Sequence, residues 1–252
     1  MALNINITRR HFRKGYSHCA TYSPHFSFWQ PRLVNWWIGL LFMIGAGLFA
    51  TACLIDLQVL GNGYSALYYA SGSVFFTAAA YLQFFQSINA YAPLQKGYRY
   101  FVWHPMYVSY WVTFTQFIGT LMFNLNTFSG LFSMSTQQYD MYSFAPNWIG
   151  SILFQISGCL VFVEIKRATP SYSIEAVVET VVCWINFFGC VAFLLSVWAI
   201  SPINTTALAG NKTAVILTLL GAICFFVASA LLWLEIKLHA THTGDVNKNS
   251  GV

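Results

Sequence analysis

One pattern of residues occurs three times along this chain. In each copy a glycine is followed by phenylalanine at position four, a small residue at seven and a polar residue at fourteen. The copies are Gly72, Phe76, Ala79 and Gln86; Gly150, Phe154, Ser157 and Glu164; and Gly221, Phe225, Ala228 and Glu235. An α-helix has about 3.6 residues per turn, so these offsets fall on one helical face. The pattern therefore predicts three helices that use the same face for equivalent contacts.

A shorter form of the pattern precedes each copy. It is a glycine followed by phenylalanine at position four, and it occurs at Gly45 and Phe49, Gly119 and Phe123, and Gly189 and Phe193. Glycines on helix faces let two backbones approach closely in lipid, where packing drives helix association. We therefore predict three two-helix hairpins that pack through glycine faces and surround a pseudo-threefold axis.

Composition places these helices in a membrane. The chain is 57% hydrophobic and 8% charged, whereas soluble domains carry roughly 25% charged residues. Six apolar runs are continuous and not alternating, which favours helices over a β-barrel. They span about 36–55, 66–88, 107–128, 148–165, 176–200 and 213–234. The predicted fold is thus an all-α membrane protein of six transmembrane helices in three parallel two-helix repeats.

The predicted organisation follows these runs along the chain. Residues 1–33 form a basic N-terminal tail and 238–252 a C-terminal tail, both cytoplasmic. Between the tails, 34–90, 103–167 and 174–237 form hairpin repeats one, two and three.

The basic residues predict how the chain is oriented. Eleven of the 12 lysines and arginines fall on one side of the predicted spans, and Lys212 alone falls on the other. By the positive-inside rule, both termini face the cytoplasm. We expect a plasma membrane or bacterial inner membrane. The first 33 residues lack acidic side chains, as organelle transit peptides do, and that alternative stays open.

Four stretches carry a resemblance to a known family. They are WWIGLLFMIGAGLFA, GSVFFTAAAYLQ, FTQFIGTLMFNLNTF and GSILFQISGCLVFVE, and the likeness covers most of residues 36–236. The chain resembles the YrhK-domain-like integral membrane proteins, in which such helix pairs recur and Gln or Glu ends the second helix. The resemblance implies a fold and a membrane location, and it implies no reaction.

The last residues of the three patterns form the candidate binding site. Gln86, Glu164 and Glu235 occupy equivalent positions near the cytoplasmic interface. One interpretation is a ring of acceptors that binds a cation or a protonated solute. The other is interfacial charge that reaches water and pairs locally with Lys166 and Lys237.

Polar groups deeper in the spans are carboxamides. Gln83, Gln116, Asn124, Asn126, Gln155 and Asn186 lie within or near the predicted helices. Such groups commonly join helices by hydrogen bonds, and they also line solute pathways. Both roles stay open on the sequence alone.

The function predicted from these features is transport of a small solute or ion. A structural or accessory protein that binds another membrane protein or lipid is the alternative, with the aromatic segment 128–147 as its docking surface. We expect no enzyme, since no catalytic motif occurs, and no cofactor or metal site. We also expect contact with the lipid bilayer, self-association or a membrane-protein partner, and no binding to nucleic acid.

Overall fold

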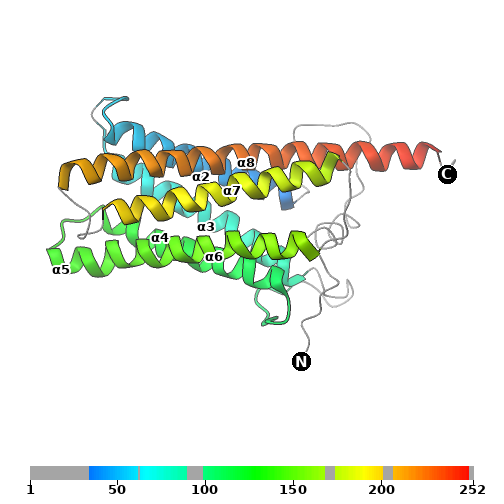
Figure 1. The fold of residues 1–252 in the computed structure, drawn as a ribbon, viewed down its shortest axis with the longest axis horizontal. Coiled ribbons are helices and arrows are strands. Elements are labelled where there is room, and N and C mark those ends of the chain that lie inside the picture. The colour runs from blue at the N-terminus through cyan, green and yellow to red at the C-terminus, as the bar shows by residue number, and fades with distance from the viewer. Residues whose placement is uncertain (1–33, 62, 90–98, 168–173, 201–206, 250–252) are drawn as a thin grey trace.

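In the part of the chain that the structure describes, six long helices lie side by side in one bundle (Figure 1). The computed structural model describes residues 34–61, 63–89, 99–167, 174–200 and 207–249, of which 166–167, 174–176, 207–210 and 234–249 are described by their backbone alone. The long helices are α2 (Val34–Asp56), α3 (Ser65–Asn89), α4 (Val108–Ser129), α6 (Ala145–Arg167), α7 (Ile174–Ala199) and α8 (Ala207–Asn249). This part of the chain contains no strand, so the predicted all-α class is confirmed.

The helices form a closed ring in which each packs against two neighbours. The order around the ring is α2, α3, α4, α6, α7 and α8, and α8 packs back on α2. Three of these contacts lie within the hairpins α2–α3, α4–α6 and α7–α8, which we call hairpins 1, 2 and 3. The start of α2 and the end of α8 lie at the same end of the bundle (Figure 1).

Four stretches of this bundle are long and apolar enough to cross a membrane. They are Val34–Asp56, Thr136–Ile165, Val177–Ala199 and Asn211–Trp233. Helices α3 and α4 have 25 and 22 residues. Both are long enough, but they are less apolar than the four stretches because serines, tyrosines and carboxamides interrupt their apolar residues. The structure therefore supports an integral membrane protein with four apolar helices among the described residues.

Two helical segments extend beyond their predicted limits. Helical structure begins at Thr136, through α5 (Thr136–Tyr139) and a π-helix (Asp140–Phe144), and continues into α6. Ser135 starts it early, because its hydroxyl and the Gln138 side chain form a capping box. Helix α8 continues to Asn249, whereas the sequence predicts a tail from residue 238. No proline interrupts this stretch, so the helix continues beyond the apolar segment.

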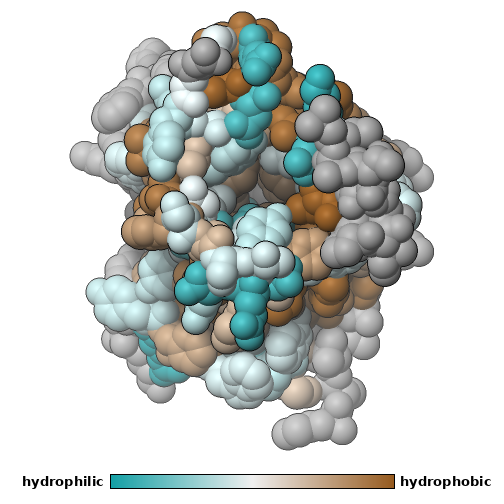
Figure 2. Space-filling model, turned by 90° about the vertical axis from the view of Figure 1, so that its left-hand side faces the viewer, coloured by the Kyte–Doolittle hydropathy of each residue, from teal (hydrophilic) through white to brown (hydrophobic). Residues whose placement is uncertain are grey.

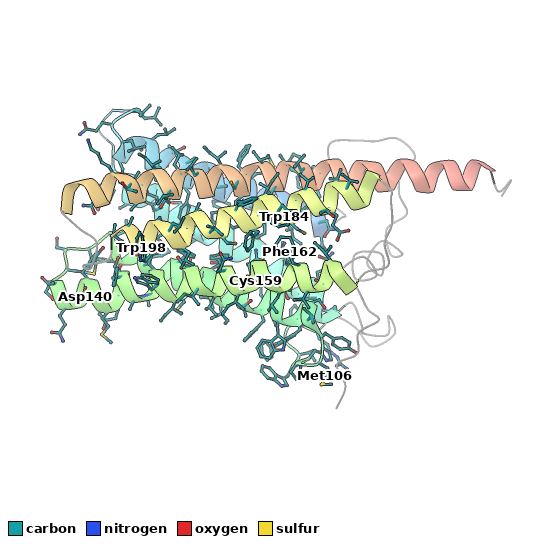
Figure 3. The ribbon with its side chains drawn as sticks, in the orientation of Figure 1. Met106, Asp140, Cys159, Phe162, Trp184 and Trp198 are labelled. Carbon is teal, nitrogen blue, oxygen red and sulfur yellow. The ribbon has the colours of Figure 1, made fainter. Side chains whose placement is uncertain are left out.

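Polar and aromatic contacts join the hairpins. Thr127 on α4 donates a hydrogen bond to Ser73 Oγ on α3 at 2.8 Å. The Trp233 indole N–H on α8 donates to the Trp36 carbonyl on α2 at 3.2 Å. Between α6 and α7, the ring centroids of Phe162 and Trp184 lie 4.5 Å apart (Figure 3).

The two ends of the bundle are named by residues that lie there. We call the end near Met106 and Arg99 the basic end and the end near Asp140 the α5 end.

Candidate functional site

Within each hairpin, the patterned glycines bring two helix backbones together. A Cβ atom on Gly119 would lie 3.2 Å from the Gly150 carbonyl oxygen, and one on Gly150 would lie 3.1 Å from that of Gly119. Gly45 and Gly72 face one another in hairpin 1 in the same way. In hairpin 3, a Cβ on Gly221 would lie 3.2 Å from the Gly189 oxygen. A Cβ on any of the six glycines would therefore lie 3.2 Å or less from an atom of the partner helix.

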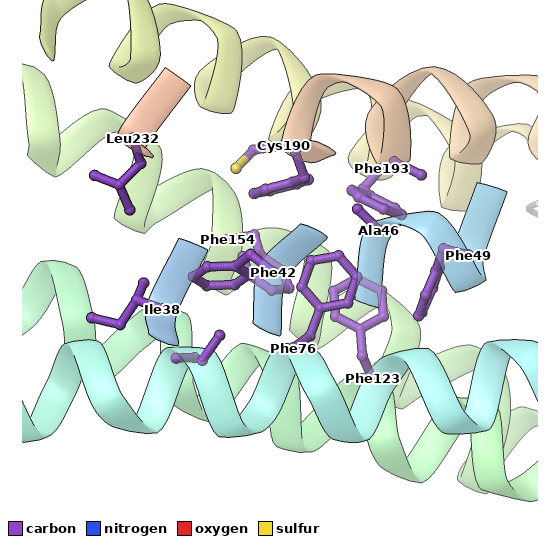
Figure 4. Close-up of a cluster of buried hydrophobic side chains, with 14 residues drawn as sticks. Ile38, Phe42, Ala46, Phe49, Phe76, Phe123, Phe154, Cys190, Phe193 and Leu232 are labelled. Atoms are coloured by element: carbon purple, nitrogen blue, oxygen red, sulfur yellow. The ribbon is translucent and has the colours of Figure 1, made fainter. Parts of the chain in front are cut away.

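The phenylalanines of both patterns meet inside the ring. They form the phenylalanine cluster: Phe49, Phe76, Phe123, Phe154, Phe193 and Phe225, all buried. Within the three hairpins, the paired ring centroids lie 5.3, 5.1 and 5.7 Å apart. Phe193 and Phe225 also contact rings of the other two hairpins. The rings project into a common interior (Figure 4), so the centre of the bundle is closed by apolar side chains.

A cavity of about 50 Å³ lies beside this cluster, and all six long helices line it. Phe154 and Phe225 form part of its wall. Its polar side chains are Gln83, Gln116, Asn186, Ser157 and Ser229. Among the side chains that the structure describes, no Asp, Glu, Lys, Arg or His lines it, and Cys183 and Cys190 are the titratable residues of its wall. The sequence alone does not group these three carboxamides into one site.

Each hairpin contributes one carboxamide to the cavity, at one level along the bundle. Gln116 and Asn186 lie seven residues before their cluster phenylalanines, and Gln83 lies seven residues after Phe76. Helix α3 runs opposite to α4 and α7, so all three offsets point toward the basic end. Seven residues correspond to ~10 Å along a helix. The carboxamide cavity therefore lies between the phenylalanine cluster and the basic end.

Hydrogen bonds leave several acceptors available to the cavity. The Ser157 hydroxyl donates to the Val112 carbonyl at 2.8 Å, and that of Ser229 donates to the Phe225 carbonyl at 2.7 Å. Each hydroxyl therefore uses its single proton in a hydrogen bond to a backbone carbonyl oxygen. Gln83 Oε1 is buried and has no hydrogen-bond partner among the described residues. A buried acceptor in this state costs roughly 1–3 kcal/mol, which a donor inside the cavity would recover.

Two members of the predicted polar ring, Gln86 and Glu164, are not among the side chains that line the cavity. Gln86 is buried, and its Nε2 donates to Asn35 Oδ1 on α2 at 2.8 Å, within its own hairpin. Glu164 is only 5% exposed on α6. It lies three residues beyond the cavity residue Val161. The side chain of Glu235 lies outside the described residues. Gln86 and Glu164 are therefore enclosed within the bundle.

The other carboxamides have different roles. Asn126 accepts a 2.7 Å hydrogen bond from Ser143 and ties the π-helix to α4. Gln155 Nε2 lies 3.7 Å from the sulfur of Cys159, an exposed residue of α6. Neither lines the cavity. What distinguishes Gln83, Gln116 and Asn186 is their shared distance from the cluster phenylalanines, a signal that was present in the sequence.

The phenylalanine cluster itself encloses a little free space. A smaller space of about 10 Å³ is lined by the six phenylalanines together with Ser73 and Thr120. Viewed from the α5 end, the molecule is hollowed near its middle, with both hydrophilic and hydrophobic side chains around the hollow (Figure 2).

Comparison of the chain with protein families, curated proteins and solved structures finds no match. The geometry of the bundle is therefore the basis for any functional conclusion.

Proposed function

We propose that all six long helices cross the membrane, as three two-helix repeats of YrhK-like type. The support is the position of α3 and α4, which complete the ring between apolar helices. Their polar residues also face partners inside the bundle, as Ser73 does with Thr127. A helix enclosed in this way tolerates polar side chains that lipid would not.

Labelling the two ends of α3 tests this topology. Val59 precedes α3 and is 66% exposed, and Tyr100 follows it and is 73% exposed. In sealed vesicles, Val59→Cys and Tyr100→Cys are expected to react with a membrane-impermeant thiol reagent from opposite sides, read by peptide mass. The basic end, with Tyr100, faces the cytoplasm in this proposal. Reaction of both from one side would contradict it.

We propose further that the protein moves a small solute through the centre of the ring. The observation that carries this function is the carboxamide cavity, to which every long helix contributes. Interior cavities between helices are common ligand sites. The phenylalanine cluster closes the path in this conformation, and hydrophobic constrictions of this kind gate pores by excluding water.

Flux into proteoliposomes tests transport. Acetamide entry is followed by light scattering, and K⁺ and Cl⁻ movement by conductance. We expect flux of at least one probe well above that of protein-free liposomes, and a several-fold change in Gln116→Leu. The control is Gln155→Leu, which removes the same group outside the cavity. Flux no greater than in protein-free liposomes for every probe would contradict transport.

The α5 end supports the accessory function as a second candidate. Phe132, Met141 and Tyr142 are exposed there, and large exposed apolar side chains mark interaction sites. Native mass spectrometry of gently extracted protein tests it. A stoichiometric protein partner that is lost in Met141→Ser would favour this function, while retention of every partner in that variant would exclude this surface.

A further inference from the structure

We infer that the carboxamide cavity recognises a small uncharged solute that carries a carbonyl acceptor and N–H donors, such as a simple amide. The inference rests on the proposed function, because it names the class of solute that the same cavity takes. Three properties of the cavity carry it: its charge, its hydrogen-bonding groups and its volume.

Charge is the first property. None of the described side chains that line the cavity is acidic or basic, and one wall is built from the rings of Phe154 and Phe225. Moving an unpaired ion into such surroundings is far more costly than moving a neutral polar molecule. A neutral solute loses only its hydrogen bonds to water, and the carboxamides replace these.

The hydrogen-bonding groups are the second property. Gln83 Oε1 needs a donor. Ser157 and Ser229 have given their protons to backbone carbonyls, so toward the cavity they can only accept. A carboxamide NH₂ group, as on Gln116 or Asn186, offers two N–H donors. The complementary solute therefore has N–H donors together with one carbonyl oxygen.

Volume is the third property. The cavity of about 50 Å³ has space for about three or four water molecules. Acetamide, with four non-hydrogen atoms, is of this size. Larger ligands such as sugars or nucleotides need several times more space.

The test measures binding in detergent, where no transport is needed. Acetamide at 100 mM is expected to raise the Tm of the protein by at least about 2 °C. NaCl at equal concentration serves as the ionic probe and is expected to raise it less. In Gln83→Leu and Gln116→Leu the acetamide shift is expected to fall by at least half. Each replacement is close in volume and apolar, so the bundle keeps its packing.

Gln155→Leu is the matched control. Gln155 Oε1 is also buried without a hydrogen-bond partner, but it lies outside the cavity. This variant is expected to keep the full acetamide shift. The absence of a shift, or an equal shift in the cavity variants and the control, would overturn the inference.

The proposals of amide binding and of transport can be contradicted independently of one another. An acetamide shift without flux supports the inference and contradicts transport. Ion flux without an acetamide shift supports transport and overturns the inference. A shift with NaCl larger than that with acetamide also overturns it, because the cavity would then favour a charged solute.

Discussion

Gly45 and Gly72 meet across hairpin 1 with each backbone carbonyl against the other glycine. A Cβ on either residue would lie 3.0 Å from the carbonyl oxygen of its partner. This reciprocal contact holds α2 against α3 just beside the phenylalanine cluster, since Phe49 and Phe76 follow one helical turn later. Close backbone approach and ring packing therefore depend on one another.

A side chain at this contact is expected to destabilise the hairpin. In Gly72→Ala, the new Cβ would lie 2.6 Å from Phe49 Cδ2 as well as close to the Gly45 carbonyl oxygen. Overpacking of this kind costs about 1–3 kcal/mol. Thermal unfolding in detergent should show a lower Tm for this variant.

Gly47→Ala is its control on the same pair of helices. A Cβ at Gly47 meets nothing within 4 Å, and alanine is the better helix former by about 1 kcal/mol. We expect an unchanged or slightly raised Tm. Equal losses in Gly72→Ala and Gly47→Ala would argue against the glycine contact.

The phenylalanine cluster is expected to contribute strongly to stability. Phe193 contacts Phe49, Phe123 and Phe225. Its truncation in Phe193→Ala leaves a buried hole, at a cost of about 3–5 kcal/mol in free energy of unfolding. On the same helix, Phe188 is 56% exposed, so Phe188→Ala should cost far less. Reversible unfolding in mixed micelles compares the two, and similar losses would contradict a central role for Phe193.

The contact between Asn35 and Gln86 is expected to be energetically coupled. Removing either partner by Asn35→Leu or Gln86→Leu takes away the 2.8 Å hydrogen bond. Hydrogen bonds between membrane helices contribute about 0.6–2 kcal/mol. A double-mutant cycle on unfolding free energies should yield a coupling in that range. Additive effects of the two substitutions would show that the bond contributes nothing measurable.

His104 is expected to make stability depend on pH. Burial, and secondarily the nearby charge of Arg99, lower the pKa of His104 below its usual value of 6.5. The folded state then binds this proton less readily than the unfolded state. Stability should be constant above about pH 6.5 and fall as the pH drops below it, toward the folded pKa. Tm values between pH 7.5 and 5 should fall less steeply in His104→Gln.

A second variant identifies the cause of this shift. Arg99→Gln removes the charge beside His104, so the pKa of the histidine should rise toward its usual value. The loss of stability on acidification, read as the fall in Tm with pH, should therefore be less steep than in the wild type. An identical pH profile in His104→Gln and the wild type would exclude His104 as the source of the slope.

Local sequence predicts most of the helical structure. Continuous apolar runs lead to the helices, and ends such as those of α2, α3 and α4 lie within two residues of their predicted limits. The early start at Thr136 was missed because an apolar run says nothing about a polar capping box such as that of Ser135. Helix α8 continues beyond its apolar segment to Asn249, and apolar periodicity does not report where a polar helix ends.

Helical periodicity also indicates which residues share a face, as Gly72, Phe76 and Ala79 do on α3. It does not state which residues of different helices meet. Which residues meet depends on the axial register of neighbouring antiparallel helices. Here the glycine contacts fix that register within each hairpin. Gln83 on α3 therefore reaches the level of Gln116 and Asn186, far away in the sequence. The sequence alone determined the helices and their contact faces, whereas the tertiary structure decided that three carboxamides share one cavity and that Gln86 turns to Asn35.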